Sequence, residues 1–303
     1  MIRLSCPAHA KVNLVLRVGP ARPDGFHEIS SLFLPLDLSD GVRVTVGKRP
    51  GPVTCRCPGH PDLDGPGNLA ARAAQALRDR LGRSERVDIR IDKRIPVVAG
   101  LGGGSADAAA VLRCLARAWK VRDRHLLAKV GLSIGSDVPF FLGSGPAWAG
   151  GRGERLRPAR VAPRYLVLLY PRDPALAIRA ADAYRWLDED RGSAMPRRAK
   201  ASALRPENDL MAPCVARRPS LRVLLRWLED AGAAAPIMSG SGPTTVGSYA
   251  DLRSARAAAR ELTGRRLDGA GVDVIVARSL ARMRGAAPWR SPRSASSPST
   301  RTS

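Results

Sequence analysis

The sequence lacks any apolar run as long as the roughly 18 residues that a membrane-spanning helix requires. Its first 16 residues carry Arg3, His9 and Lys11 within their apolar part, so the h-region and cleavage site of a signal peptide are missing as well. Cysteines are few, odd in number and scattered, which argues against a disulfide framework. We therefore expect a cytoplasmic protein with free thiols and no membrane partner.

Aromatic residues are also scarce, at 4%, and the 27 acidic residues are far fewer than the 50 Lys and Arg, which leaves a net charge of +23. Such an excess of positive charge is typical of nucleic-acid-binding surfaces. However, so few aromatics cannot build stacking platforms, and no helix-turn-helix, zinc-finger or RNA-binding signature is present. We expect a solvated, arginine-rich surface with sites for anionic substrates and no specific nucleic-acid partner.

A metal site is the alternative use of the short Cys55-x-Cys57 pair, which has His60 nearby. The spacing does not fit a zinc knuckle, and no second pair follows. We predict that these cysteines are ordinary free thiols.

What the chain does contain is a glycine-rich segment at residues 95–109, around which the rest is organised. Before it, apolar and charged residues alternate over 87–92, which predicts a strand with one buried face. After it, apolar residues at helical spacing predict a helix over 108–120. Between the two lie four glycines in the five positions 100–104, followed by Ser105 at the expected helix N-cap.

A strand, a glycine loop and a helix in this order make a cradle for phosphate. Glycine allows a bulky anion to approach the backbone, and the first turn of a helix offers unpaired N–H groups. The run is not a Walker A loop, and it fails the G-x-G-x-x-G dinucleotide fingerprint because the last slot is Ser105. A merely flexible loop is a poor alternative, since four glycines cost backbone entropy on folding.

The loop also matches P-x-x-x-G-L-x-G/S-G/S-S/A, the second motif of the GHMP small-molecule kinases. The chain resembles this family, and within it the 4-diphosphocytidyl-2-C-methyl-D-erythritol kinases, nearly residue for residue at this loop. The resemblance implies an ATP site formed by Pro96, Val97, Val98, Ala99, Gly100, Leu101, Gly102, Gly103, Gly104, Ser105 and Ala106. It also implies that Asn68 lies near the adenine, as a weaker member of the site, because an asparagine before an alanine-rich helix is also a plausible N-cap.

Two further motifs near the N-terminus resemble this family. The run at residues 8–16 is similar to its P-A-K-x-N-L motif, with His9 in place of the usual proline, and it puts Lys11 and Asn13 on one face of a strand. The run at residues 22–27 is similar to R-x-D-G-Y/F-H. The resemblance implies that Lys11 is catalytic and that Asn13 binds the substrate. It also implies that Phe26 and His27 hold the cytidine group by stacking and hydrogen bonding.

Later in the chain, residues 135–141 resemble the family run that carries the catalytic aspartate, here Asp137, with Val138, Phe140 and Phe141 expected to wall it from water. An aspartate at a turn before proline is otherwise most often a capping residue. Gly240, Ser241 and Gly242 resemble the third family motif, a loop that closes over the substrate. Tyr184 falls where the family has an aromatic over the cytosine, and a half-buried helix residue is an equally good interpretation.

The residue patterns alone support a two-domain α+β chain. The resemblance implies the GHMP kinase fold: a ribosomal protein S5 domain 2-like, ATP-binding domain at 1–155 and a ferredoxin-like domain at 156–280. Residues 143–153, which are rich in glycine, are expected to connect the two close to the site. Residues 281–303 form a basic tail that is expected to be disordered.

The implied reaction is ATP-dependent phosphorylation of the 2-hydroxyl of 4-diphosphocytidyl-2-C-methyl-D-erythritol, a step of non-mevalonate isoprenoid biosynthesis. In it Asp137 accepts the proton of the acceptor alcohol, and Mg²⁺ contacts Ser105. Two alternatives stay open: another GHMP kinase, or a catalytically silent relative that binds anions or nucleic acid. We expect a monomer or a weak homodimer.

Overall fold

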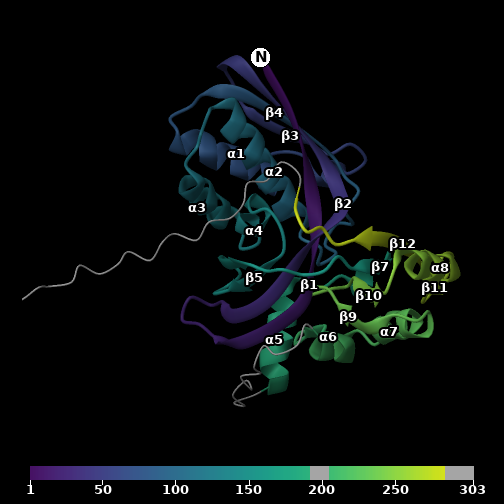
Figure 1. Cartoon of the computed structure of the whole chain (residues 1–303). Helices are drawn as coiled ribbons and strands as arrows, with labels where there is room; N and C mark the ends of the chain where they lie inside the picture. Colours follow the sequence, from purple (N-terminus) through teal and green to yellow (C-terminus); the bar gives the residue numbers. More distant parts are fainter. Residues whose placement is uncertain (192–204, 284–303) are drawn as a thin grey trace, which may run out of the picture.

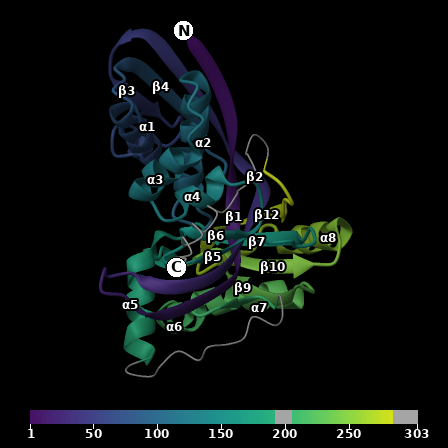
Figure 2. The ribbon, with the colours of Figure 1, turned by 60° about the vertical axis from the view of Figure 1, so that its left-hand side comes forward.

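The computed structural model describes residues 1–191 and 205–283. Its framework is a long antiparallel ribbon made of β1 (Ile2–Ala21) and β2 (His27–Pro50), which runs from one end of the molecule to the other (Figures 1 and 2). Two shifts of register near the middle of β1, between His9 and Lys11 and between Asn13 and Val15, bend the ribbon. Because the ribbon extends along both halves of the molecule, residues of β1 can contribute to a site between them.

The first half of the molecule contains a sheet with the order β3-β4-β2-β1-β8, in which β5 also pairs with β2, and β6 pairs with β5. The further strands are β3 (Val53–Arg56), β4 (Glu85–Asp92), β5 (Ala147–Gly150), β6 (Arg155–Pro158) and β8 (Glu207–Asn208). Four helices gather on one side of this sheet (Figure 1), namely α1 (Leu69–Arg80), α2 (Gly103–Ala118), α3 (Arg124–Ile134) and α4 (Val138–Leu142). A short 3-10 turn, Pro61–Leu63, precedes α1. The predicted strand over 87–92 and the predicted helix after the glycine loop are confirmed.

The second half builds an antiparallel sheet with the order β11-β12-β7-β10-β9. Its strands are β7 (Tyr165–Pro171), β9 (Ala234–Met238), β10 (Thr245–Tyr249), β11 (Arg266–Leu267) and β12 (Ala270–Arg278). Its helices are α5 (Ala180–Arg191), α6 (Met211–Arg217), α7 (Ser220–Asp230) and α8 (Leu252–Leu262), with a 3-10 turn at Pro174–Leu176. Helices α7 and α8 pack on the sheet through strongly amphipathic faces.

One buried cluster joins the two halves. It combines Val12 and Leu14 of β1 with Leu166 and Leu168 of β7 and Ile237 of β9. Apolar contact across the junction removes it from water, which favours one fixed arrangement of the two sheets. The site that lies at this junction is therefore built on two halves that share a core.

Two expectations about connections are wrong. Residues 143–153 are no simple linker, because they contain β5, which pairs with Ser31–Phe33 of β2 and with β6. This pairing joins segments more than 100 residues apart, so no local pattern announces it. Met283, which was expected to lie in a disordered tail, is held in place: its N–H donates to the carbonyl of Ser144 at 2.6 Å and its side chain is buried. The rest of that tail, 284–303, and residues 192–204 lie outside the described residues.

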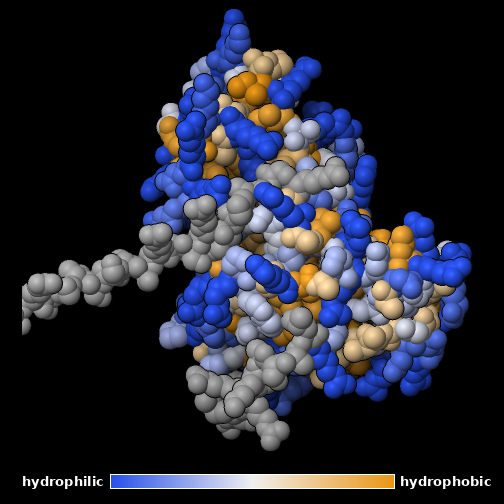
Figure 3. All heavy atoms as spheres, in the orientation of Figure 1, coloured by the Kyte–Doolittle hydropathy of each residue, from blue (hydrophilic) through white to orange (hydrophobic). Residues whose placement is uncertain are grey.

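The surface and the cysteines agree with the composition. Hydrophilic side chains dominate the face drawn in Figure 3, with apolar residues in small separate groups. The five cysteines are free and buried. Within 1–191 and 205–283 no helix is both long and apolar enough to cross a membrane, and no cluster of three or more His, Cys, Asp or Glu side chains is placed to hold a metal.

Candidate active site

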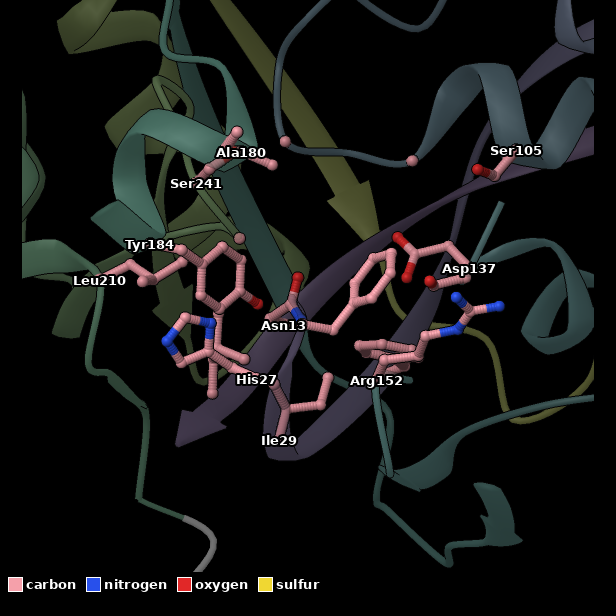
Figure 4. Close-up of a pocket in the computed structure, with 18 of the residues that line it drawn as sticks. Asn13, His27, Ile29, Ser105, Asp137, Arg152, Ala180, Tyr184, Leu210 and Ser241 are labelled. Atoms are coloured by element: carbon pink, nitrogen blue, oxygen red, sulfur yellow. The ribbon is translucent and has the colours of Figure 1, made fainter. Parts of the chain in front are cut away.

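Two adjoining cavities open at the junction of the two halves. The first, of about 640 Å³, is lined from β1, β2, α5 and the turn before α4 (Figure 4). The second, of about 750 Å³, lies along the glycine loop. Gly102 and Ser105 border both cavities, so the start of α2 stands where the two spaces meet.

A lysine–carboxylate pair lies at the floor of the first cavity. Lys11 Nζ is 3.2 Å from Asp137 Oδ2 and donates to Asn13 Oδ1 at 2.6 Å. Asn13 Nδ2 donates in turn to Ser31 Oγ at 2.8 Å, and Ser31 donates to the carbonyl of Val15 at 2.6 Å. Lys11, Asn13 and Ser31 are buried, and this chain of hydrogen bonds fixes the direction of the ammonium group.

Asp137 is positioned as a cavity residue and not as a cap. It stands at the N-cap of α4, yet its side chain makes no capping hydrogen bond. Its carboxylate stays 30% exposed on the cavity side. The expectation that Val138, Phe140 and Phe141 wall it from water is wrong, because these three side chains pack into the core of the first half and none borders the cavity. The ring of Phe33 borders the cavity next to the ion pair, with Lys11 Nζ 4.9 Å from its centre.

Helix α2, which follows the glycine loop, begins earlier than predicted. The N-cap of α2 is Gly102, whose φ is +70°, and Ser105 lies within the first turn. Glycine is required at 102 because a Cβ there would stand 2.9 Å from the Phe141 ring and 3.2 Å from Lys11 Cε. Gly103 and Gly104 then form the first helical turn without side chains, so the N–H groups of that turn are accessible to a ligand in the second cavity.

The glycine loop at 100–104 is in close contact with the second glycine loop, at 240–242. A Cβ at Gly100 would lie 2.3 Å from the carbonyl oxygen of Ser239, and Ser239 Oγ donates to the carbonyl of Gly100 at 3.1 Å. Gly240 approaches Asn13 Oδ1 from the other side. Gly240 and Ser241 border the first cavity, whereas Gly242 lies behind them, against Met238.

Aromatic rings form the far end of the first cavity. The ring of His27 stacks on that of Tyr184, with centroids 5.0 Å apart and an interplanar angle of 23°. His27 Nε2 lies 2.9 Å from Asp188 Oδ1, so one edge of the imidazole is already engaged. Phe26 is 44% exposed at the mouth. Burial, and then the charge of Asp137, raise the pKa of Tyr184, which keeps its hydroxyl protonated.

Several residues that line the first cavity were not predicted from the sequence. The guanidinium of Arg152 lies over the Phe26 ring at 4.7 Å and borders the cavity (Figure 4). This arginine falls in the stretch that was expected to connect the domains. Leu16, Ile29 and Leu210 complete the apolar lining. They belong to strands and a helix start whose burial patterns do not distinguish a cavity wall from a core.

The second cavity contains most of the predicted ATP residues, namely Pro96, Val97, Val98, Ala99, Gly102, Gly103, Gly104 and Ser105. Leu101 and Ala106 are buried behind it, and Gly100 faces the first cavity instead. Asn68 borders the second cavity, but its side chain is used as an N-cap: Oδ1 accepts from Ala70 N at 2.8 Å and Nδ2 donates to the Leu63 carbonyl at 2.9 Å.

A buried ionic cluster that was not predicted lies beside this cavity. Lys93 Nζ contacts Asp40 Oδ2 at 2.5 Å and Asp107 Oδ2 at 2.8 Å. Asp40 Oδ1 also accepts from the N–H groups of Arg94 and Ile95, whereas Asp107 Oδ1 is buried without a partner. Burial, only partly offset by the charge of Lys93, raises the pKa of Asp107 to about 7.

This combination of a glycine-rich helix start at a cavity, a lysine–carboxylate pair and a two-domain α+β fold is that of a small-molecule kinase. Residues 68–145 match the family model of the GHMP kinases N terminal domain, and residues 199–268 match that of the GHMP kinases C terminal. A crystal structure of a homoserine kinase from Cytophaga hutchinsonii shares the fold, with a TM-score of 0.67 at 17% identity over 93% of this chain and 96% of that one.

Relatives of higher sequence identity show to which family of GHMP kinases the chain belongs. A 4-diphosphocytidyl-2-C-methyl-D-erythritol kinase of Anaeromyxobacter dehalogenans strain 2CP-C is 62% identical over 100% of this chain and 99% of its own length. A crystal structure of a 4-(cytidine 5'-diphospho)-2C-methyl-D-erythritol kinase has a TM-score of 0.72 at 34% identity, covering 90% of this chain and 99% of that one. The chain belongs to the 4-diphosphocytidyl-2-C-methyl-D-erythritol kinase family.

Proposed function

We propose that this protein transfers the γ-phosphoryl group of ATP to the 2-hydroxyl of 4-diphosphocytidyl-2-C-methyl-D-erythritol, in the non-mevalonate route to isoprenoids. Membership of the GHMP kinases implies the use of ATP. The observation that carries the proposal is the position of the Lys11–Asp137 pair, between a phosphate cradle on one side and an aromatic-ended cavity on the other. That order of groups matches donor phosphate, acceptor hydroxyl and nucleobase.

The acceptor alcohol is a poor nucleophile at neutral pH because its pKa lies far above 7. Asp137 accepts its proton, and the hydroxyl oxygen forms a bond to the γ-phosphorus while the bond to the bridging oxygen of ADP breaks. Lys11 holds the acceptor oxygen and offsets negative charge on the transferred group. Asn13 and Ser31 keep the ammonium aimed at that point through their hydrogen bonds.

The glycine loop holds the donor. The N–H groups at the start of α2, including those of Gly103 and Gly104, are expected to bind the phosphates, and the positive end of the helix favours their charge. The residues also fit Mg²⁺ of the kind that is bound largely by nucleotide phosphates and water, with Ser105 Oγ as its protein contact, since Ser105 borders both cavities. Such an ion would neutralise charge on the β- and γ-phosphates.

The first cavity suits the rest of the substrate. Phe26 and Tyr184 offer ring faces for a cytosine, and His27 offers its remaining polar edge. Arg152 supplies a guanidinium at the mouth, where a diphosphate between nucleoside and polyol would pass. The other guanidinium at this cavity, that of Arg185, is already paired with Asp182 and Glu189. Gly240 and Ser241 close the side next to Asn13.

The test is ADP release, measured in a coupled assay with 4-diphosphocytidyl-2-C-methyl-D-erythritol, mevalonate and homoserine in parallel. We expect turnover with the cytidylyl substrate alone. Turnover with mevalonate or homoserine would favour another GHMP kinase, and no turnover with any of them, in the presence of measurable ATP binding, would favour a silent relative. The presence of both Lys11 and Asp137 argues against the silent relative.

We also propose that the protein works in the cytoplasm as a monomer or a weak homodimer. One chain supplies every group named above, so the proposed reaction requires no partner subunit. Sedimentation velocity over a range of concentrations tests this, and a stable higher oligomer would contradict it.

A further inference from the structure

The segment that leads into the glycine loop is held at both of its ends by the shared core. Ile95, Ala99 and Leu101 are buried in the cluster that includes Leu166 and Leu168 of the second half. Between these anchors, Val97 is partly exposed and Val98 is 59% exposed. Apolar burial therefore does not fix the backbone at 97 and 98, although both residues border the second cavity.

The backbone at Val98 is strained. Its φ is +53°, in the left-handed region that a β-branched residue adopts at a cost of about 1–2 kcal/mol. Such a conformation persists only where the surroundings hold it. Since the Val98 side chain is largely in solvent, the restraint has to act on the neighbouring backbone.

A side chain from the other half supplies that restraint. Tyr170, on β7, donates a hydrogen bond from its hydroxyl to the carbonyl of Val97 at 2.9 Å. Burial, and secondarily the charge of Asp273, raise the pKa of Tyr170, so its hydroxyl remains a donor throughout the neutral range. The bond fixes the peptide unit directly before the strained residue.

We propose that Tyr170 is a positioning residue for the nucleotide: its bond to the Val97 carbonyl keeps Val98 in the left-handed conformation that shapes the wall of the second cavity. The inference rests on the proposed function in taking that cavity as the ATP site. It implies that the second half, which contributes no glycine of the phosphate loop, sets nucleotide affinity through one hydroxyl group. Tyr170 itself does not border the second cavity, so this effect is transmitted through the loop.

The test compares Tyr170→Phe with wild type by isothermal titration of ADP into the full chain, without acceptor substrate. Loss of one hydrogen bond is expected to raise the Kd by about 3- to 10-fold. The matched control is Tyr249→Phe, which removes a buried hydroxyl that has no hydrogen-bond partner, from a strand of the same sheet; its Kd should stay within about 2-fold of wild type. Equal Kd values for wild type and Tyr170→Phe would overturn the proposal.

A second pair of variants separates positioning from general stability. Asn tolerates the left-handed region better than Val, so Val98→Asn reduces the need for the restraint. In the Val98→Asn background, Tyr170→Phe should change the ADP Kd by less than about half the factor seen in wild type. The same factor in both backgrounds would show that the hydroxyl does not act through the strain at Val98, and would overturn the proposal.

Steady-state kinetics gives a third measurement. Tyr170→Phe should raise the KM for ATP with the KM for the acceptor and the kcat nearly unchanged, whereas a general loss of structure would alter all three. Because the ADP titration needs no acceptor, its outcome is independent of which alcohol is phosphorylated. A wild-type protein that binds ADP but turns over no acceptor refutes the proposed function and leaves the comparison of Kd values intact.

Discussion

The ammonium group of Lys11 lies 3.2 Å from the carboxylate of Asp137, although one residue is on the first strand and the other is on the turn before α4. The hydrogen bonds from Lys11 to Asn13 and from Asn13 to Ser31 hold this ion pair in one direction, facing the first cavity. The pair borders the first cavity only, close to Gly102, which borders both cavities. Five predictions follow from this arrangement and its surroundings.

Asp137→Asn removes the proposed proton acceptor while keeping the shape of the side chain. General-base contributions of this kind are about 10²- to 10⁴-fold, so kcat in the ADP-release assay should fall by at least about 100-fold. The affinity for ATP should stay within a few-fold, because Asp137 faces the first cavity and does not border the second. Wild-type turnover in this variant would refute the role given to Asp137.

Phe26→Ala removes an exposed ring from the mouth of the first cavity. We expect the KM for the cytidylyl substrate to rise by about 10-fold or more, since stacking on an aromatic ring is worth on the order of 1–3 kcal/mol per base. The KM for ATP should change little. Equal changes in both KM values would remove Phe26 from the proposed cytosine site.

Arg152→Met tests the proposed contact with the diphosphate. The variant keeps the apolar length of the side chain over Phe26 and removes the charge. A lost charge-assisted bond should raise the KM for the cytidylyl substrate by about 10-fold, with partial recovery in Arg152→Lys. Arg185→Met is the control at the same cavity, because that guanidinium is already paired with acids. If both methionine variants behave alike, Arg152 has no special role.

Gly100→Ala tests the contact between the two glycine loops. A Cβ at this position meets the carbonyl oxygen of Ser239 at 2.3 Å, and the φ of +72° adds strain. Gly59→Ala is a matched control, since its φ is +84° but nothing lies within 4 Å of the added carbon. Gly59→Ala should cost about 1–2 kcal/mol in urea unfolding, and Gly100→Ala clearly more, with loss of ADP binding. Equal free energies of unfolding would contradict the contact.

Asp107→Asn tests the buried ionic cluster through pH. The pKa of Asp107 is about 7 in the folded state and near 4 when unfolded, so the folded chain binds the extra proton between these values. The stabilisation that this group contributes is therefore complete below about pH 4 and is lost progressively as the pH rises to about 7. The wild type should therefore lose stability relative to Asp107→Asn over that window, by at most about 1.4 kcal/mol per pH unit.

The measurement for this last prediction is urea unfolding of both proteins at several pH values between 4 and 8. Asn keeps one oxygen for Lys93 and puts an amide where Asp107 has its unpaired oxygen, so the variant should fold. A difference in stability that stays constant or grows in favour of the wild type with rising pH would contradict the raised pKa.

Much of this molecule follows from the sequence alone. Period-two alternation over 87–92 and helical spacing after the glycine loop gave β4 and α2, because burial of one face imposes these periods locally. The two-residue spacing of Lys11 and Asn13 put both on one face of a strand for the same reason. The motifs, through their resemblance to a family, predicted the fold, which is confirmed. The ATP loop and the acceptor site that they also indicate remain predictions.

Other features depend on contacts that no local pattern contains. The helix begins after Gly102 and not after Ser105, and position 102 has to be glycine because the Phe141 ring and Lys11 fill the space that a side chain would need. The walls of the first cavity, and Arg152 in particular, depend on β5 pairing with a strand far away in the sequence. The bond from Tyr170 to Val97 exists because the shared core holds the two halves together. The sequence by itself determined which chemical groups the protein has and which local elements carry them, since propensity and periodicity act over a few residues. Only the tertiary structure decided which of those groups meet, because that depends on packing between segments that are close in space and distant along the chain.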